Sequence, residues 1–277
     1  MAKIKEKNNE NNRTVYFSVG IRVDRFRADG FVNGSRVLDD AHVERLRDEL
    51  ARVIRDQHRA DLPQPVLLRN LAQDEYHPVW QVVNIWEASQ PFRDLVHNRT
   101  IAQEVAQLTA ARELRLWHDQ IQYKPAGTGG VNMWHQDSPY WPPLQPKDQQ
   151  VTAWVALDDV DESNGCMSMV VGSHAWGDQI EFLHTLTDFG DMPREFQGHA
   201  LEVKRCPVRK GEVHYHHALT WHGSHANTSD RPRRAIALHF MTDQTRYDAS
   251  KDHPMKPFVE SVDGDLVRGE HFPRVWP

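Results

Sequence analysis

Trp134-His135-Gln136-Asp137 and, much later in the chain, Trp221-His222-Gly223-Ser224 are the stretches that decide the predicted fold and chemistry. They supply two imidazoles and one carboxylate, a set typical of a facial site for non-haem Fe(II). Such a triad occupies one face of the octahedral ion, and the opposite face stays free for a cosubstrate and dioxygen. A closed structural zinc site has no such free positions. We therefore predict His135, Asp137 and His222 as metal ligands.

Whether a His-x-Asp triplet indicates a pair of metal ligands depends on its local secondary structure. With 17 His in a chain of 277 residues, about one such triplet is expected by chance. On a strand, residues two apart point to the same face, so we expect His135 and Asp137 to chelate one ion while Gln136 turns away. His42-Val43-Glu44 has the same spacing but lies in a predicted helix, where positions i and i+2 diverge.

Downstream of His222, a hydroxyl and a group of arginines predict an anion site. Ser224 is followed by Arg231, Arg233 and Arg234. A guanidinium can hold the remote carboxylate of a dicarboxylate whose other end chelates iron, and a serine hydroxyl can donate to the same carboxylate. The alternative is that these arginines form a solvated turn and that His222 is a packed histidine.

Three blocks between residues 116 and 241 carry a wider pattern. They are Asp119-Gln120-Ile121-Gln122-Tyr123-Lys124-Pro125 with the His135 motif, Val151-Thr152-Ala153-Trp154-Val155-Ala156-Leu157-Asp158-Asp159 with Asn164-Gly165-Cys166 and Gly172-Ser173-His174, and Trp221-His222-Gly223-Ser224 through Arg233. In this order and spacing they resemble the phytanoyl-CoA dioxygenase family of Fe(II)- and 2-oxoglutarate-dependent oxygenases, which includes ectoine hydroxylases and many natural-product oxygenases.

The resemblance implies a site and a reaction. Iron would lie on the predicted triad, and the C5 carboxylate of 2-oxoglutarate would lie on Arg233 and Ser224, with Arg231 and Arg234 as poorer clamps. Gln122 matches a position that faces this cosubstrate, and Trp154 and Trp141 match positions that line its pocket. An aromatic residue in an apolar strand such as that of Trp154 is nevertheless more often part of the core. The implied enzyme consumes O2 and 2-oxoglutarate, releases succinate and CO2, and hydroxylates a small molecule. Because Asp137 is present, the halogenase variant of the family, which lacks this carboxylate, is disfavoured.

Rival interpretations remain open. Desaturation, cyclisation or epimerisation would use the same triad and clamp, so sequence does not separate them from hydroxylation or name the substrate. A metal-binding cupin-like module without catalysis is the alternative of another class, and the Arg233 and Ser224 pair argues against it. No catalytic residue beyond the metal site is predicted.

The implied fold is α+β but mainly β: a double-stranded β-helix, the jelly roll of cupin-like barrels, buttressed by N-terminal helices. Apolar residues at helical spacing after Asp39 and Asp40 predict a helix to about Gln57, and a capping-box pattern at Thr100 and Gln103 predicts a second. Short strands separated by turn residues are then predicted at Ile121–Tyr123, Val151–Leu157, Met167–Val171, Glu212–His216 and Ala235–Met241.

Other segments close to the triad have two interpretations each. Tyr140 and Trp141, between Pro139 and the Pro142-Pro143 pair, either pack a substrate or close the barrel end. The long insertion 176–197 is either a lid that shapes substrate choice or a surface excursion. Additional histidines are interpreted as core or hydrogen-bonded residues rather than ligands: His214, His216, His217, His225 and His239.

The whole-chain composition sets outer limits. With 39% apolar residues, residues 15–277 are predicted to form a single domain after a flexible tail at 1–14. A net charge of −6 argues against nucleic acid as a partner, and no apolar run suits a membrane span. Two cysteines imply no disulfide framework, which fits a reducing cytoplasm. The partner is then a small molecule, and the oligomeric state is open.

Overall fold

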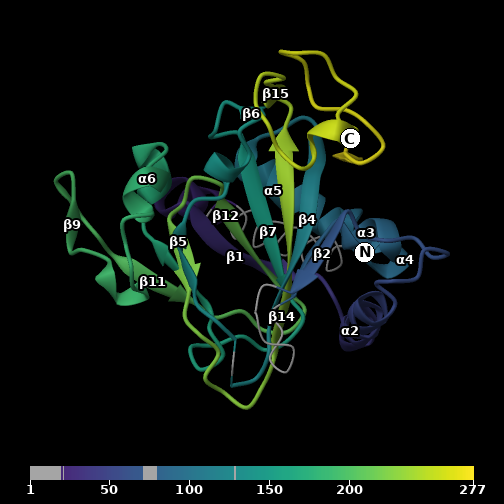
Figure 1. Ribbon diagram of the computed structural model, residues 1–277. Helices are drawn as coiled ribbons and strands as arrows, with labels where there is room; N and C mark the ends of the chain where they lie inside the picture. Colours follow the sequence, from purple (N-terminus) through teal and green to yellow (C-terminus); the bar gives the residue numbers. More distant parts are fainter. Residues whose placement is uncertain (1–19, 21, 71–79, 128) are drawn as a thin grey trace, which may run out of the picture.

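Two antiparallel sheets face each other in the computed structural model, which describes residue 20 and residues 22–70, 80–127 and 129–277 (Figure 1). The predicted tail at 1–14 lies outside the described residues. The larger sheet has the order β1-β12-β7-β14-β4-β3-β2, with β16 also paired to β4. Its strands are β1 (Phe31–Arg36), β12 (Glu212–His217), β7 (Gln150–Ala156), β14 (Arg233–Thr242), β4 (Leu114–Lys124), β3 (Trp80–Val83), β2 (Leu67–Asn70) and β16 (Arg274–Trp276).

The smaller sheet completes the predicted jelly roll. Its order is β11-β8-β13-β5, made of β11 (Val203–Cys206), β8 (Met167–Val170), β13 (His222–Ser224) and β5 (Asn132–His135). Two short ribbons lie outside these sheets and pair β9 (Glu195–Phe196) with β10 (His199–Ala200) and β6 (Leu144–Gln145) with β15 (Arg246–Tyr247). The interior between the two sheets holds the inward side chains of both.

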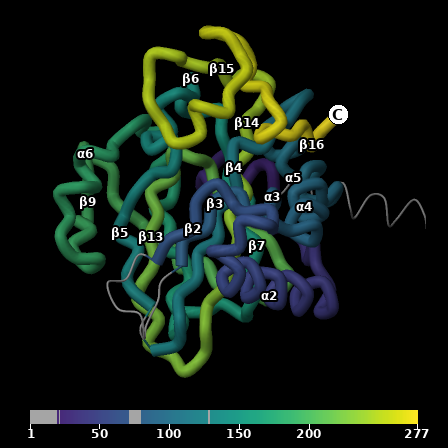
Figure 2. The backbone as a smooth tube through the Cα atoms, turned by 45° about the vertical axis from the view of Figure 1, so that its right-hand side comes forward, coloured from purple at the N-terminus to yellow at the C-terminus, as the bar shows by residue number. Residues whose placement is uncertain are grey.

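Helices cover the outer face of the larger sheet (Figure 2). They are α2 (Asp40–Arg55), α3 (Ile85–Ala88), α4 (Gln90–Val96) and α5 (Arg99–Thr109). Strand periodicity separates the two faces, because alternate side chains point to opposite sides. On β7, Val151, Ala153 and Val155 pack in the core shared with the helices. The intervening Thr152 and Trp154 therefore point into the barrel.

The predicted elements are largely confirmed. All five predicted strands lie within or coincide closely with β4, β7, β8, β12 and β14, and the first predicted helix is α2, whose Asp39 cap accepts from the His42 amide. The predicted capping box at Thr100 is wrong: Asn98 caps α5, and its side-chain oxygen accepts from the Thr100 and Ile101 amides. Among the described residues, no helix has both the length and the apolar character needed to cross a membrane.

The insertion 176–197 forms a small layer over the smaller sheet. It contains α6 (Ile180–Leu183), the 3-10 turn η3 (Phe189–Asp191) and β9, and it follows the 3-10 turn η2 (Ser173–Trp176). Leu183 and Phe189 pack there with Trp134 and Trp221, the aromatic residues that precede the two motif histidines. Of two more 3-10 turns, η1 (Ser138–Tyr140) follows β5, and η4 (Lys256–Phe258) precedes the C-terminal strand β16.

Candidate metal and cosubstrate site

Strand register brings the two motif histidines together. His222 on β13 stands opposite His135 on β5 in the antiparallel pairing, and the two ring centroids are 4.1 Å apart. The Oδ1 atom of Asp137 lies 3.8 Å from Nε2 of His135 and 3.5 Å from Nε2 of His222. These three residues are the group in the described part of the chain whose donor atoms lie close enough together to share a metal ion.

The expectation that His135 and Asp137 share one strand face is wrong, although their side chains do converge. β5 ends at His135, and Asp137 has helical φ and ψ of −74° and −51° at the start of η1. The amides of Asp137 and Ser138 both donate to the carbonyl of Ala218, which turns the chain out of the sheet. The turn, rather than strand alternation, aims the carboxylate at the imidazoles.

Backbone carbonyls fix the orientation of both imidazoles. Nδ1 of His135 lies 2.8 Å from the carbonyl of Met133, and Nδ1 of His222 lies 3.0 Å from that of Thr220. A carbonyl only accepts, so Nδ1 carries the proton and Nε2 offers its lone pair to a metal. Burial, together with the neighbouring histidine, lowers the pKa of His135 to about 4, and burial lowers that of His222 to about 4. Both rings are therefore neutral, as metal ligands must be, at physiological pH.

The second oxygen of Asp137 is held from the opposite side. Oδ2 accepts from the Thr152 hydroxyl at 2.7 Å and lies 3.0 Å from Nε2 of His216. Burial would raise the pKa of Asp137, but the surrounding histidines, His222 and His216 foremost, hold it well below its usual value. With Oδ2 engaged, only Oδ1 faces the two Nε2 atoms.

Replacing Thr152 with valine is expected to weaken metal binding. The change keeps the side-chain shape but removes the donor to Oδ2, and loss of such an outer partner typically lowers metal affinity about 10- to 100-fold. Competition with a fluorescent chelator for Mn(II) measures this, with Thr152→Ser as the matched control that keeps the hydroxyl. An affinity of Thr152→Val equal to that of the parent chain would contradict a positioning role.

A buried guanidinium lies at the other end of the site. Arg233 on β14 is fully buried and donates to the carbonyl of Gly165 at 2.9 Å and to Oγ of Ser224 at 3.4 Å, while its Nη2 is 3.5 Å from Oε1 of Gln122. Its Cζ lies 5.4 Å from the ring centre of Trp154, whose side chain supports the guanidinium from the barrel interior. The four residues predicted to contact the cosubstrate, Arg233, Ser224, Gln122 and Trp154, therefore lie next to one another in the fold.

The charge of Arg233 has no acidic partner among the described residues. Its hydrogen-bond partners are neutral, and its Nε has none in the described structure. Burial lowers its pKa to about 10, so it remains a cation at neutral pH. A buried, unpaired cation is costly unless an anion binds beside it. The donor set therefore fits the remote carboxylate of a dicarboxylate.

The other two arginines of the cluster are engaged elsewhere. Arg231 pairs with Asp161 at 2.7 Å, and Arg234 makes a two-pronged pair with Asp158. Their carboxylate partners leave Arg233 as the arginine that can receive an external anion.

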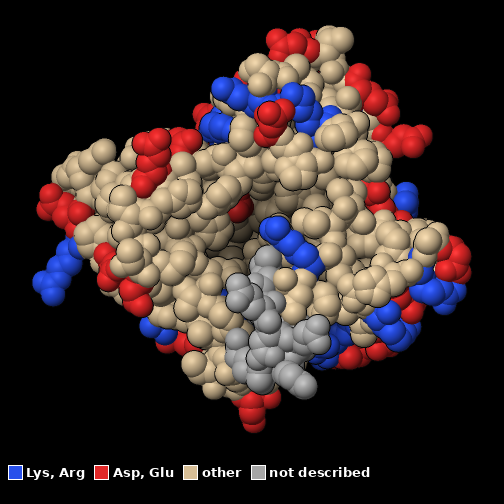
Figure 3. All heavy atoms as spheres, in the orientation of Figure 1, with Lys and Arg blue, Asp and Glu red and all other residues tan. Residues whose placement is uncertain are grey.

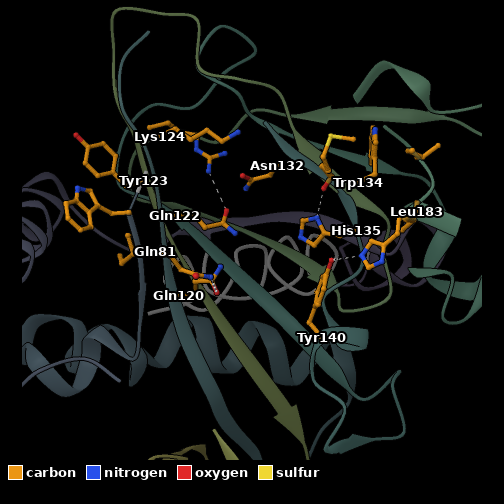
Figure 4. Close-up of a pocket in the computed structure, with 16 residues that line it drawn as sticks. Gln81, Gln120, Gln122, Tyr123, Lys124, Asn132, Trp134, His135, Tyr140 and Leu183 are labelled. Atoms are coloured by element: carbon orange, nitrogen blue, oxygen red, sulfur yellow. Dashed lines mark hydrogen bonds between the residues drawn. The ribbon is translucent and has the colours of Figure 1, made fainter. Parts of the chain in front are cut away.

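A cavity of about 490 Å³ opens beside His135 and Arg233. The face that contains it is hollowed at its centre, and charged side chains on this face lie mostly around the periphery (Figure 3). One wall is polar and comes from β3 and β4, where Gln81 donates to Gln120 at 3.0 Å and Gln122 follows two residues later (Figure 4). The volume and mixed lining suit a small-molecule substrate together with a cosubstrate.

The insertion and η1 form the opposite wall. Leu183, His184 and Leu186 line the cavity, and the hydroxyl of Tyr140 lies 2.9 Å from Nε2 of His184 (Figure 4). Gln136, between the two motif ligands, donates to the Gly177 carbonyl and accepts from the Gln179 amide, so it anchors the insertion beside the metal site.

Trp141 lies elsewhere, although it was predicted to line the substrate pocket with Tyr140. It is 4% exposed and packs against His118 and His239. The turn of η1 sends the two neighbouring aromatic residues in different directions, so Tyr140 faces the cavity and Trp141 enters the core.

The remaining histidines have other partners. The side chain of His214 is hydrogen-bonded to that of Asn33, and the side chain of His239 is hydrogen-bonded to that of Thr152. His217 lies within hydrogen-bond distance of the Asp148 carbonyl, and His225 packs on Phe189. Sequence reasoning missed the contacts of Thr152 and His216 with Asp137 and the contact of Lys124 with Ser224. The alternation Gln120, Gln122, Lys124 on β4 was the one pattern that indicated an inward Lys124.

A jelly roll that gathers two histidines and one carboxylate beside a buried arginine defines the class of non-haem iron, 2-oxoglutarate-dependent oxygenases. The family model described as Phytanoyl-CoA dioxygenase (PhyH) matches residues 26–235. The chain therefore belongs to the phytanoyl-CoA dioxygenase family.

Individual relatives are distant but cover most of the chain. A phytanoyl-CoA dioxygenase domain-containing protein 1 homolog from Caenorhabditis briggsae is 25% identical over 268 residues, which cover 82% of this chain and 92% of the relative. The peroxisomal phytanoyl-CoA dioxygenase of Bos taurus is 24% identical over 262 residues, which cover 89% of this chain and 75% of the relative.

Two solved structures from nogalamycin biosynthesis share the fold. The non-heme alpha ketoglutarate dependent carbocyclase SnoK is 27% identical with a TM-score of 0.73, covering 92% of this chain and 95% of its own. The epimerase SnoN, in complex with Fe3+, alpha ketoglutarate and nogalamycin RO, is 25% identical with a TM-score of 0.71, covering 93% of this chain and 98% of its own.

Proposed function

We propose that this oxygenase binds Fe(II) through His135, Asp137 and His222 and oxidises a small metabolite or natural-product intermediate. The observation that carries the proposal is the geometry of the triad: two neutral Nε2 atoms and one carboxylate oxygen converge, and each ligand is fixed from behind by a hydrogen bond. The relative SnoN, whose structure contains Fe3+ and alpha ketoglutarate, supports the same pair of cofactors here.

Arg233 and Ser224 would hold the C5 carboxylate of 2-oxoglutarate, with Gln122 beside it and Trp154 behind the guanidinium. When bound, iron, 2-oxoglutarate and O2 supply an oxidation that releases succinate and CO2. The protein residues orient the cosubstrate through charge-assisted hydrogen bonds and exclude water from the barrel interior. Tyr140 and the insertion 176–197 would close the substrate side of the cavity.

Hydroxylation is the proposed outcome, and halogenation is disfavoured because the Asp137 carboxylate would take the ligand position that a halide needs. Cyclisation or epimerisation would use the same residues, and the relatives SnoK and SnoN carry these names. Product analysis separates the outcomes: hydroxylation adds one oxygen atom to the substrate, whereas the others leave its oxygen count unchanged.

Residues 15–277 are proposed to act as a single oxygenase domain. Helices and the larger sheet share one continuous core, which supports this assignment. Cys166 and Cys206 are both free and buried, which supports a reducing compartment such as the cytoplasm.

Anaerobic reconstitution with Fe(II) and 2-oxoglutarate tests the proposal directly. Chelation of iron by the cosubstrate is expected to give a weak visible charge-transfer band, and admission of O2 should then release succinate. Iron binding without the band or succinate would instead favour the metal-binding module that lacks catalysis.

A further inference from the structure

A second basic residue, Lys124, lies beside the proposed carboxylate clamp. It occupies the end of β4 and is 2% exposed, and its Nζ lies 2.7 Å from Oγ of Ser224. Arg233 donates to the same Oγ at 3.4 Å from the neighbouring strand. Two buried basic side chains therefore meet at one hydroxyl group. As for Arg233, no acidic partner of Lys124 occurs in the described ranges of the chain.

The ammonium group has no donor left for direct contact with a ligand. Besides Oγ, Nζ donates to the carbonyls of Ser224 at 3.3 Å and His225 at 2.6 Å. An ammonium has three N–H donors and no acceptor. Lys124 therefore acts on an anion through Ser224 and through its charge.

The direction of the Ser224 hydroxyl depends on this contact. A hydroxyl has one donor and two acceptor lone pairs. Because Oγ accepts from Lys124 and from Arg233, its own proton is free to donate, and within the described part of the chain it has no acceptor. That proton can then point to an incoming carboxylate. An uncharged amine at position 124 has a lone pair of its own and would compete for the proton.

We propose that Lys124 is a positioning residue of the cosubstrate site: its ammonium group fixes Ser224 as a donor to the remote carboxylate of 2-oxoglutarate. This rests on the proposed function, since it assumes that the carboxylate lies on Arg233 and Ser224. It also explains why a lysine is buried next to an arginine, an arrangement that is unfavourable without an anion.

Electrostatics couples this role to pH. Burial first, and then Arg233, lower the pKa of Lys124 to about 6, so the lysine is largely neutral at pH 7.5 before an anion binds. An anion on Ser224 favours the charged form and raises this pKa, so binding takes up a proton. Among the residues that the structure describes, the other ionisable groups facing Lys124 are Arg233, which stays charged, and His225, whose pKa is lowered by burial.

The test compares binding of two ligands to the Mn(II)-loaded full chain by calorimetry. 2-Oxoglutarate carries the C5 carboxylate, whereas 2-oxovalerate has a methyl group there and keeps the chelating end. Lys124→Met is expected to weaken 2-oxoglutarate binding about 10- to 100-fold and 2-oxovalerate binding less than about twofold, because only the former has an ion that the lysine stabilises. Lys147→Met is the matched control, since Lys147 also donates to two backbone carbonyls.

A pH series gives a readout that a structural role would not move. From pH 6.5 to 8.5 the affinity of the parent chain for 2-oxoglutarate should fall at least about fivefold, since the required proton becomes harder to acquire. Lys124→Met should show no such decline. Equal losses for both ligands, or an unchanged pH slope in the variant, would overturn the inference. No binding of 2-oxoglutarate by the parent chain would instead overturn the proposed function.

Discussion

Replacing Asp137 with alanine is expected to abolish 2-oxoglutarate turnover and to lower metal affinity by more than the roughly 100-fold that loss of an outer partner can cause. The carboxylate supplies the one anionic ligand of the triad, and its Oδ1 lies within 3.8 Å of both histidine Nε2 atoms. Succinate release under O2 measures turnover, and competition with a chelator for Mn(II) measures affinity.

The fold should survive this substitution. Removing Asp137 eliminates the desolvation cost of a buried carboxylate, which offsets the hydrogen bonds that Thr152 and His216 lose. Asp137→Asn is the matched control, because it keeps the size and a ligand oxygen but removes the charge, and we expect an intermediate affinity. Thermal unfolding without metal checks the fold. Parental metal affinity in Asp137→Ala would refute its assignment as a ligand.

The sequence predicted those parts of the site that lie in local patterns. The three ligands and Arg233 lie in short sequence motifs whose chemistry is recognisable without the fold. Thr152 and His216 were not recognised as partners of Asp137, because that contact depends on how β7 and β12 pair and face β5 across the barrel. Register of this kind is set by long-range packing rather than by local propensity.

The two local errors have a common physical cause. Asp137 was expected on a strand and Thr100 at a helix cap, and both assignments followed sequence spacing. In the fold, backbone hydrogen bonds to Ala218 turn the chain before Asp137, and Asn98 takes the cap because its side chain reaches two free amides of the first turn. Spacing identified the residue types, whereas tertiary hydrogen bonds decided the backbone around them.

Arg233→Met is expected to raise the dissociation constant for 2-oxoglutarate by about 100-fold to several thousand-fold. Removing one member of a buried ion pair costs about 3–5 kcal/mol, and each 1.4 kcal/mol corresponds to tenfold in affinity. The Fe(II) charge-transfer band, titrated with 2-oxoglutarate under anaerobic conditions, measures this constant. Arg233→Lys is the matched control, and because a point charge cannot replace the planar fork, its affinity should lie between those of the parent and the methionine variant.

The thermal stability of Arg233→Met should not fall with its affinity for 2-oxoglutarate. Without 2-oxoglutarate, the guanidinium is buried among neutral partners and lies next to Lys124, so the empty site carries a desolvation cost. Methionine removes that cost, and the variant without ligand should unfold at a temperature no lower than the parent. If Arg233→Met bound 2-oxoglutarate as tightly as the parent chain, the assignment of Arg233 as the carboxylate-binding residue would be wrong. A large loss of stability would instead assign the arginine a structural role through its hydrogen bond to Gly165. If Arg233 serves to bind an anion, the methionine variant should lose affinity for 2-oxoglutarate without losing thermal stability.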